Sequence, residues 1–330
     1  MLQYLNLTTT NPSFNLAAEE FVFESLPKDR SYFMLWQNDR AVIIGKYQNT
    51  LAEINLPYIE ANGIRVVRRL SGGGAVYHDL GNLNYSFIAD AKESERLDLR
   101  LFCEPVLRTL SSFGVKAELK GRNDMTVDGQ KFSGNAQMIR HGRVLHHGTI
   151  LFDSDLEAVT LALHVDEAKI RAKGIRSVRS RVTNLTPFFD PPITLPAFRQ
   201  ALLKEVLRAE PGEERCFTKA ELTVIRSLQA RRYDAWEWNF GRSPECTIRK
   251  RARFEGVGSI EAYISLEHGL IRTVAFRGDY FSLHDPDGLS ALLAGRKLDR
   301  ESVEEVLGGV EVSTFFSGLK AACLTDLLLA

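Results

Sequence analysis

The stretch of the sequence with the clearest chemistry is a run of three glycines preceded by two arginines, Arg68-Arg69-Leu70-Ser71-Gly72-Gly73-Gly74-Ala75-Val76-Tyr77-His78-Asp79. Because glycine has no side chain, the backbone N–H groups of such a run can approach a ligand closely and form an anion-binding concavity. Arginine guanidinium groups bind phosphate or carboxylate through paired hydrogen bonds. The run therefore predicts a cradle for a nucleotide phosphate or a carboxylate, although a glycine-rich turn taken alone is more often a plain loop. No Gly-Lys-Ser/Thr follows the glycines, and their spacing does not match the dinucleotide-binding fingerprint.

A second group of polar residues flanks Asp128-Gly129, a dipeptide typical of two-residue hairpin loops. Gly121-Arg122-Asn123-Asp124 precedes this turn, and Lys131-Phe132-Ser133-Gly134-Asn135-Ala136 follows it. Residues two apart on a strand face the same side, so the ammonium of Lys131 and the hydroxyl of Ser133 would project together. A lysine on a hairpin is usually only a solvated surface residue. This group therefore indicates a site only if other candidate residues lie beside it in the fold.

Both strings resemble motifs of the lipoate–protein ligase family, whose relatives are the biotin–protein ligases and the octanoyl transferases. Three further segments carry the resemblance, in the family's order: His146-His147-Gly148-Thr149, Gly174-Ile175-Arg176-Ser177-Val178-Arg179-Ser180-Arg181-Val182-Thr183-Asn184-Leu185 and Trp236-Glu237-Trp238-Asn239-Phe240-Gly241. Five motifs in one order, spread over most of the chain, argue against a chance match. The resemblance implies an ATP-dependent enzyme that activates lipoate as lipoyl-AMP, releases pyrophosphate and passes the lipoyl group to a lysine of an acceptor protein.

The resemblance also implies which residues take part. A carboxylate and an amine form a salt at neutral pH and not an amide, so lipoate must first gain a leaving group such as AMP. Lys131 is implied as the catalytic residue, in contact with both the lipoate carboxylate and the α-phosphate of ATP. ATP binding is implied for Arg69, Gly74, Ala75, Val76, Tyr77 and Lys131. Lipoate binding is implied for Lys131, Arg69, Ser71, Gly73 and His147.

Further expectations concern the adenylate, the metal and the acceptor. A loop that closes over the adenylate is implied for Lys173, Arg176 and Ser177. Magnesium is expected on the triphosphate, with Asp124 or Asn123 as its protein-side partner. The aliphatic tail of lipoate is expected against Leu16 and Trp36, for which plain membership of the core is an equal explanation. The implied acceptors are the lipoyl domains of 2-oxoacid dehydrogenase subunits and the glycine-cleavage H protein.

Other interpretations remain open from the sequence. An octanoyl or lipoyl transferase would carry the acyl group on a reactive cysteine and need no ATP, yet the interval from Glu104 to Arg215 contains no cysteine and Cys103 begins a predicted helix. A non-catalytic, cofactor-binding regulator would not need Lys131 and Arg69, which are both present. A biotin ligase is disfavoured because the Gly-Arg-Gly-Arg loop of that family is replaced here by Arg-Leu-Ser-Gly-Gly-Gly.

Composition narrows the choice of partners. Of the 330 residues, 44% are hydrophobic and 25% are charged, values ordinary for a globular protein. The 42 basic and 42 acidic residues balance, so no bulk charge draws the chain to nucleic acid or to an acidic membrane. The four cysteines form no Cys-x-x-Cys pair, and the first residues lack the basic and apolar regions of a signal peptide. We therefore expect a cytoplasmic protein with neither nucleic-acid nor membrane partners.

The elements that must position these residues are predicted to form an α+β fold. A helix is expected between Asn11 and Pro27, followed by a hairpin made of Tyr32–Trp36 and Ala41–Ile44. Strands are expected from Val115 to Phe152, with turns at Asp128-Gly129 and His141-Gly142. Helices are expected from Leu156 to about Arg231, interrupted by a basic stretch.

A domain boundary is predicted where the helical pattern breaks, around Trp236 to Pro244. We expect a large catalytic domain, residues 1–245, with a mixed or antiparallel sheet flanked by helices. A small α+β accessory domain, residues 246–330, would follow, with strands over Ile260–Ser265 and Leu270–Phe276 and short helices after them. By resemblance, this domain is expected to swing away once the adenylate has formed, about a hinge at the boundary.

Overall fold

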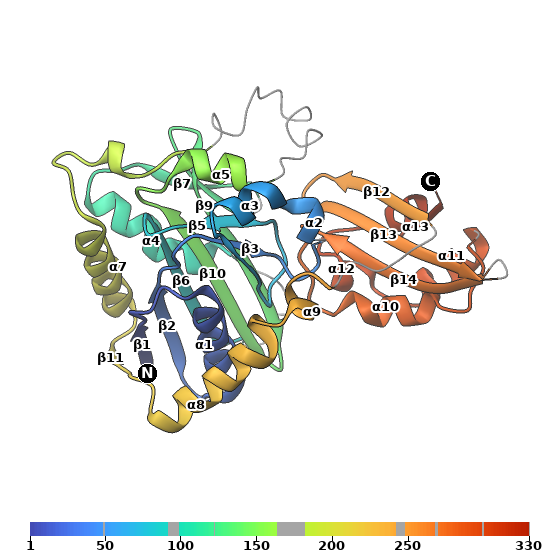
Figure 1. Cartoon of the computed structure of the whole chain (residues 1–330), viewed down its shortest axis with the longest axis horizontal. Helices are drawn as coiled ribbons and strands as arrows, with labels where there is room; N and C mark the ends of the chain where they lie inside the picture. The colour runs from blue at the N-terminus through green and yellow to red at the C-terminus, as the bar shows by residue number, and fades with distance from the viewer. Residues whose placement is uncertain are drawn as a thin grey trace.

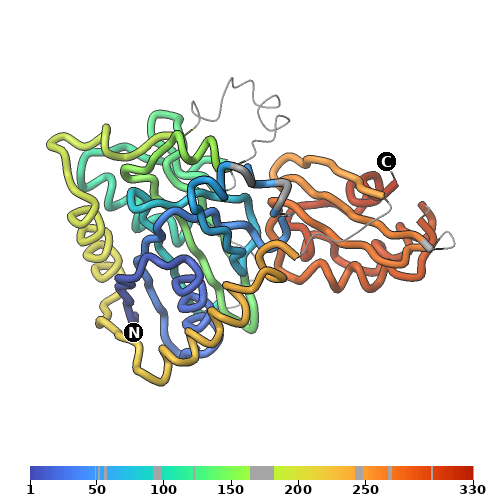
Figure 2. Tube along the Cα trace, viewed as in Figure 1, coloured from blue at the N-terminus to red at the C-terminus, as the bar shows by residue number. Residues whose placement is uncertain are grey.

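The computed structural model describes residues 1–48, 50–91, 99–121, 123–163, 182–241, 248–267, 270–298 and 300–329. Figure 1 shows two parts, a large one that contains the N-terminus and a small one that contains the C-terminus. In Figure 2 the blue to yellow trace stays within the large part, whereas the small part is orange and red. Both parts combine strands with helices, which confirms the predicted α+β class with a separate small C-terminal domain.

The large part is built on an eight-stranded sheet with the order β11-β1-β2-β6-β10-β9-β8-β7. The sheet is mixed, as predicted, because β1 pairs in parallel with β2 and β11 whereas the other neighbours pair antiparallel. Its strands are β1 (Leu2–Asn6), β2 (Ser31–Trp36), β6 (Asn82–Asp90), β7 (Ala117–Lys120), β8 (Asp124–Val127), β9 (Gln130–Arg140), β10 (Arg143–Leu151) and β11 (Gly212–Glu214). The short polar strand β11 lies where the sequence predicts helix. It is a strand because it pairs with β1 at the edge of the sheet, and it has no apolar pattern from which it could be predicted.

Two tight turns join the strands that matter most for the site. Asp128-Gly129 connects β8 to β9 with φ values of 48° and 77°, and His141-Gly142 connects β9 to β10 with φ values of 53° and 74°. Positive φ at both central residues defines the turn type that suits the twist of a hairpin. Both predicted turns are therefore confirmed, and they place Lys131 on β9 and His147 on the neighbouring strand β10.

The predicted hairpin of Tyr32–Trp36 with Ala41–Ile44 is wrong, although both segments are strands. β3 (Ala41–Ile44) belongs to a separate three-stranded sheet with the order β4-β3-β5, in which β4 is Arg65–Arg68 and β5 is Val76–His78. Both edges of β2 are already occupied by β1 and β6, so no edge of β2 is left for β3. The glycine run connects β4 to β5, and these two strands pair with opposite edges of β3.

Helices cover both faces of the eight-stranded sheet. Alternate side chains of β2 enter different cores: Phe33 packs with α4 and α7, whereas Tyr32 packs with α1 and α8. The side chain of Asn11 accepts hydrogen bonds from two backbone N–H groups at the start of α1, which confirms the predicted helix start. The helical segments described in the large part are α1 (Pro12–Ser25), α2 (Thr50–Glu53), α3 (Leu56–Ala61), α4 (Arg100–Ser112), α5 (Leu156–Ala162), a 3-10 turn (Thr186–Phe188), α7 (Leu195–Ala209), α8 (Lys219–Leu228), a π-helical turn (Gln229–Tyr233) and α9 (Trp236–Asn239).

The small part has its own core, which lies between a three-stranded antiparallel sheet and helices. Tyr47 of the large part also packs into this core. The sequence predicts two of its strands but not β12, in which arginines alternate with half-buried residues. Its elements are β12 (Ile248–Phe254), β13 (Gly258–Glu267), β14 (Leu270–Gly278), α10 (Pro286–Leu293), α11 (Arg300–Gly308), α12 (Val312–Phe315) and α13 (Ala321–Leu329).

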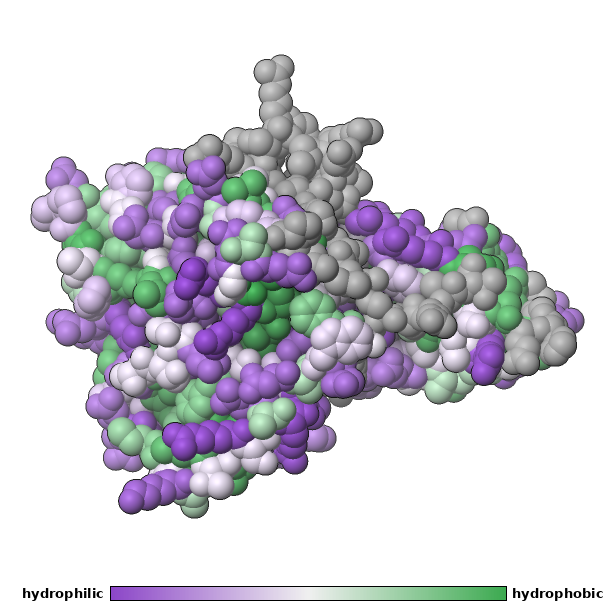
Figure 3. All heavy atoms as spheres, viewed as in Figure 1, coloured by the Kyte–Doolittle hydropathy of each residue, from purple (hydrophilic) through white to green (hydrophobic). Residues whose placement is uncertain are grey.

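Hydrophilic residues cover most of the face shown in Figure 3, and the apolar areas between them are small. Within the described ranges, no helix is both long enough and apolar enough to cross a bilayer.

Candidate active site

A cavity of about 100 Å³ opens where the glycine run meets β9 and β10. Most of the residues that the sequence predicts for ATP and lipoate line it, namely Arg69, Gly73, Gly74, Ala75, Val76, Lys131 and His147. Ser71, Tyr77 and Asp124 adjoin these residues without lining the cavity. The adenylate-loop residues Lys173, Arg176 and Ser177 lie outside the described residues. Segments far apart in the sequence thus meet at one place.

Lys131 reaches the cavity from the second residue of β9. Its Nζ lies 2.6 Å from Oδ1 of Asp124 on the neighbouring strand, and 34% of its side chain is exposed. A Cβ on Gly134 would lie 2.9 Å from this Nζ, so the glycine leaves the room that the ammonium occupies. The carbonyl of Lys131 accepts a hydrogen bond of 2.8 Å from the N–H of Thr183, a residue of the fourth motif. The ammonium is therefore held at a defined position and remains accessible.

Arg69 is buried and shapes the glycine turn from inside. Its guanidinium donates hydrogen bonds to the carbonyls of Ile43 at 3.1 Å, Gly72 at 2.6 Å and Gly74 at 2.9 Å. Its Nε donates to the hydroxyl of Ser71 at 3.1 Å. Burial lowers the pKa of Arg69 to about 10, so the group stays charged at neutral pH. Arg69 therefore fixes the turn and brings a positive charge to the cavity wall.

Arg68 precedes Arg69 but does not line the cavity. Its guanidinium donates to the carbonyls of Gly45 at 2.9 Å, Gln48 at 2.7 Å and Trp238 at 2.9 Å. These bonds tie β4 to the loop after β3 and to α9, within the fifth motif. The first arginine of the pair therefore serves the fold that supports the turn.

His147 is the centre of a buried chain of hydrogen bonds. Its Nδ1 lies 2.9 and 3.0 Å from the two carboxylate oxygens of Glu19 on α1, and its Nε2 lies 2.6 Å from Oγ of Ser71. Ser86 also donates to Glu19, and the indole N–H of Trp36 donates to Ser86 at 2.9 Å. Glu19 is 1% exposed and was missed by sequence reasoning. Its signal in the sequence is a pair of adjacent acidic residues, Glu19 and Glu20, between the apolar residues of α1.

The small part contacts the glycine turn directly. The N–H of Gly73 donates to the carbonyl of Tyr280 at 3.2 Å, and a Cβ on Gly72 would lie 2.3 Å from that carbonyl oxygen. Gly73 has φ of +91°, which side-chain-bearing residues rarely adopt. The ring of Tyr47 stacks on Tyr280 with centroids 4.9 Å apart, and its hydroxyl lies 2.8 Å from Oγ of Ser282. The glycines thus permit both the turn and the close approach of the small part.

Two further histidines are buried in the neutral form, namely His78, which lines the cavity, and His146, which does not. Burial lowers the pKa values of His78 and His146 to about 3. Nδ1 of His78 lies 3.1 Å from the side-chain nitrogen of Asn38, and the ring of His146 stacks on Phe102 with centroids 5.1 Å apart. Across the ranges that the structure describes, no cluster of three or more His, Cys, Asp or Glu side chains could hold a metal ion.

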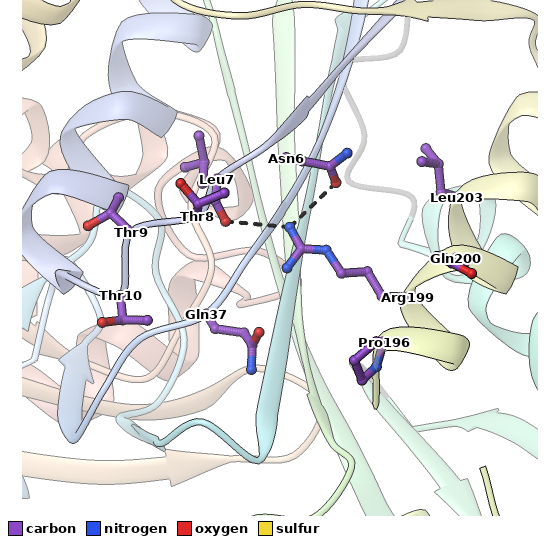
Figure 4. Close-up of a pocket in the computed structure, with 10 residues that line it drawn as sticks. All are labelled: Asn6, Leu7, Thr8, Thr9, Thr10, Gln37, Pro196, Arg199, Gln200 and Leu203. Carbon is purple, nitrogen blue, oxygen red and sulfur yellow. Dashed lines mark hydrogen bonds between the residues drawn. The ribbon is translucent and has the colours of Figure 1, made fainter. Parts of the chain in front are cut away.

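A larger cavity, of about 450 Å³, lies apart from the predicted site, between the end of β1 and α7 (Figure 4). Arg199 reaches across it and donates to the side chain of Asn6 and the carbonyl of Leu7, both at 3.4 Å (Figure 4). It also donates to the carbonyl of Leu35 at 3.0 Å. Burial lowers the pKa of Arg199. This arginine fastens α7 to the ends of β1 and β2, and no predicted site residue lines the cavity.

Comparison with known proteins identifies the family. Residues 11–207 match the model of the lipoyl protein ligase A/B catalytic domain, and residues 243–328 match the model of the bacterial lipoate protein ligase C-terminus. The chain belongs to the lipoate–protein ligase family. It is 41% identical to lipoate-protein ligase LplJ of Bacillus subtilis, over 99% of this chain and 100% of that protein. It is 40% identical to lipoate–protein ligase 1 of Staphylococcus aureus, over 95% of each.

Several solved structures share the fold, and two of those below are named lipoate–protein ligases. LipL1 of P. falciparum, in complex with lipoate, has a TM-score of 0.81 and 25% identity over 100% of this chain and 99% of that one. A lipoate-protein ligase A bound with ATP has a TM-score of 0.62 and 30% identity over 73% and 99%. The bi-partite lipoate protein ligase of Thermoplasma acidophilum, reported with its E2 lipoyl domain, has a TM-score of 0.64 and 32% identity over 74% and 98%.

Proposed function

We propose that this lipoate–protein ligase family member activates lipoate with ATP and transfers the lipoyl group to a lysine of an acceptor protein. The observation that carries the proposal is the meeting of Lys131 and the glycine run in one cavity. The two relatives that share about 40% identity with it are named lipoate–protein ligases. Two similar structures contain lipoate or lipoic acid, and another contains ATP.

The first step joins two anions, which makes a cation between them essential. An oxygen of the lipoate carboxylate attacks the α-phosphorus of ATP, and the bond from that phosphorus to the bridging oxygen of the β-phosphate breaks. Preorganised donors stabilise the charge that develops on the phosphoryl oxygens. Of the two cations among the described lining residues, Lys131 is more exposed than Arg69. Its ammonium would exchange Asp124 for the carboxylate and the α-phosphate, and the backbone of residues 74–77 would supply further donors.

The second step releases AMP. The ε-amine of the acceptor lysine attacks the carbonyl carbon of lipoyl-AMP, loses a proton to solvent, and the carbon–oxygen bond to AMP breaks. Lys131 would donate to the carbonyl oxygen and so favour the attack. One residue thus serves both steps, because the carboxylate oxygen it binds first becomes the carbonyl oxygen of the adenylate.

Lipoate has a charged end and an apolar end, and the cavity offers a wall for each. Leu16, Trp36 and Ile43 provide apolar side chains, which suit the aliphatic chain and the dithiolane ring. Lys131 and Arg69 provide the cations for the carboxylate, and His147 also lines the cavity, with the buried Ser71 in contact with its Nε2.

Magnesium is expected to accompany ATP, and Asp124 fits as one of its ligands. Mg²⁺ in nucleotide sites is held by one or two carboxylates, with phosphate oxygens and water completing the shell. One carboxylate oxygen of Asp124 contacts the ammonium of Lys131, and 27% of the Asp124 side chain is exposed. The carboxylate can therefore also bind a metal ion. The ion would neutralise part of the triphosphate charge.

We propose lipoyl domains of 2-oxoacid dehydrogenase subunits and the glycine-cleavage H protein as acceptors, in the cytoplasm. The pairing of the Thermoplasma acidophilum ligase with an E2 lipoyl domain supports the lipoyl-domain class. We divide the chain into a catalytic domain, residues 1–245, and an accessory domain, residues 246–330. The proposed boundary and hinge fall at residues 242–247, outside the described residues.

The test is to incubate the full chain with lipoate, ATP, magnesium and an unmodified lipoyl domain. We expect pyrophosphate release, together with a gain of one lipoyl group in the intact mass of the acceptor, both dependent on ATP. Acyl transfer that needs no ATP would instead indicate the transferase. The transferase is disfavoured because Cys103 in α4 is completely buried and does not line the cavity. Lipoate binding with neither product would indicate a non-catalytic regulator.

A further inference from the structure

The sheet of the small part carries an excess of positive charge on one face. Strand pairing places Arg251, Glu261 and Arg277 in one row across β12, β13 and β14. Side chains directly opposite each other on neighbouring strands share a face. Among the side chains that the structure describes, this face carries the arginines Arg249, Arg251, Arg253 and Arg277 and the carboxylates of Glu261 and Asp279. The face therefore favours an anionic ligand.

The row at the end of the sheet nearest the large part is made of Arg253, Ser259 and Asp279. In Figure 1 the arrowhead of β12 points toward the large part. Nη1 of Arg253 lies 3.6 Å from Oδ2 of Asp279 and 3.0 Å from Oγ of Ser259. The other carboxylate oxygen of Asp279 accepts the N–H of Ser259 at 2.5 Å. Asp279 is thereby fixed, while 35% of the Arg253 side chain stays exposed.

This row adjoins the glycine run. A Cβ on Gly74 would lie 3.9 Å from the Cβ of Asp279, which is ordinary contact. The next residue, Tyr280, accepts the hydrogen bond from Gly73. Gly74 lines the cavity and is one of the residues proposed to bind ATP. The guanidinium of Arg253 is therefore separated from the nucleotide-binding turn by a single carboxylate.

A triphosphate needs more cationic donors than the described cavity wall supplies. Its two lining cations are Arg69 and Lys131. Arg69 directs its N–H groups to carbonyls of the turn, and Lys131 is proposed for the lipoate carboxylate and the α-phosphate. Neither accounts for the β- and γ-phosphates. A guanidinium suits these groups because its planar fork binds phosphate oxygens in pairs.

We propose that Arg253 binds the β- and γ-phosphates of ATP and stabilises pyrophosphate as it leaves, with Asp279 as the residue that positions it. The lipoate oxygen forms its bond to the α-phosphorus, the bond to the bridging oxygen breaks, and its electron pair stays on pyrophosphate, where Arg253 meets it. No proton moves in this step. The inference rests on the proposed function, and it confines the role of Arg253 to adenylate formation, since pyrophosphate has left before the lipoyl group is transferred.

The first test compares Arg253→Gln with Arg251→Gln. Both arginines lie on the same face of β12, but Arg251 pairs with Glu261 one row farther from the turn. We expect Arg253→Gln to lower kcat/KM for ATP in pyrophosphate release by about 100-fold, as for loss of one donor to a developing charge. Transfer from supplied lipoyl-AMP should stay unchanged, as should thermal melting. Equal effects of the two substitutions, or an equal loss in transfer, would overturn the proposal.

The second test separates phosphate binding from neutralisation of Asp279. If Arg253 binds phosphate, the double variant Arg253→Gln/Asp279→Asn stays defective, whereas recovery of wild-type ATP use would show that Arg253 only balances the carboxylate. Arg253→Lys should recover part of the activity. Calorimetry with inorganic pyrophosphate alone should show weaker binding to Arg253→Gln than to Arg251→Gln. A wild-type chain that binds pyrophosphate through Arg253 yet makes no lipoyl-AMP would contradict the proposed function and leave this inference standing.

Discussion

Replacing Lys131 by methionine removes the ammonium and keeps the length of the side chain. The ion pair that is lost, 2.6 Å to Asp124, is partly exposed on both sides. Pairs of this kind contribute about 1 kcal/mol or less to folding, which lowers Tm by only about 2–4 °C in a chain of several hundred residues. Loss of a donor that stabilises the reacting groups costs about 100-fold or more in rate. We therefore expect a folded protein with at least about 100-fold slower formation of lipoyl-AMP.

Pyrophosphate release with saturating lipoate, ATP and magnesium measures this loss, and thermal melting in parallel monitors the fold. Lys120→Met is the matched control, because Lys120 lies on β7 opposite Asp124, is exposed and does not line the cavity. It should keep wild-type activity. A Lys131→Met variant that releases pyrophosphate at close to the wild-type rate would refute the assignment, and so would a loss that follows Tm in both variants.

Three other perturbations follow from the structure. Gly72→Val should lower Tm and abolish adenylation, because its Cβ would lie 2.3 Å from the carbonyl oxygen of Tyr280, whereas Gly74→Val should retain its Tm and bind ATP and lipoate more weakly by calorimetry. Arg68→Met should cost more than about 3 kcal/mol in urea unfolding, because several buried carbonyls lose their donor. His78 and His146 have pKa values of about 3 in the folded chain and about 6.5 in the unfolded chain. The unfolded chain therefore binds more protons, and the free energy of unfolding should fall as the pH drops below about 6.5. Between pH 7 and 5 each should cost about 2 kcal/mol, and His146→Phe should remove about half of the combined loss.

Features of the fold that depend on local conformation could be predicted from the sequence. The turns at Asp128-Gly129 and His141-Gly142 need positive φ, which these dipeptides adopt readily, and both occur as expected. The partner of Ala41–Ile44 could not be predicted in this way. A strand buried on both faces has the same apolar pattern in either sheet, and its partner depends on which edges are already occupied. The strand at Ile248–Phe254 was missed because its arginines obscure the alternation of its inner residues.

The site shows the same limit. The glycine run and Lys131 were found because their residue types are unusual for a plain turn and because a known family shares them. Glu19 and Arg253 were not found, since neither belongs to a motif. Each gains its place only through tertiary packing, Glu19 of α1 against His147 on the face of the sheet that α1 covers, and Arg253 beside the turn through Asp279.

The two consecutive arginines at the end of β4 link the catalytic turn to the small part. Arg68 holds the loop that carries Tyr47, and Arg69 holds the turn that carries Gly73. Tyr280 contacts both, by ring stacking with Tyr47 and by its carbonyl with Gly73. The hydrogen bond from Gly73 to Tyr280 contributes only about 1 kcal/mol. A phosphate that accepts the same N–H can therefore replace it. Once pyrophosphate has left Arg253, the phosphate of lipoyl-AMP would loosen this contact between Tyr280 and the turn. We propose that the outward swing of the small part starts at Gly73.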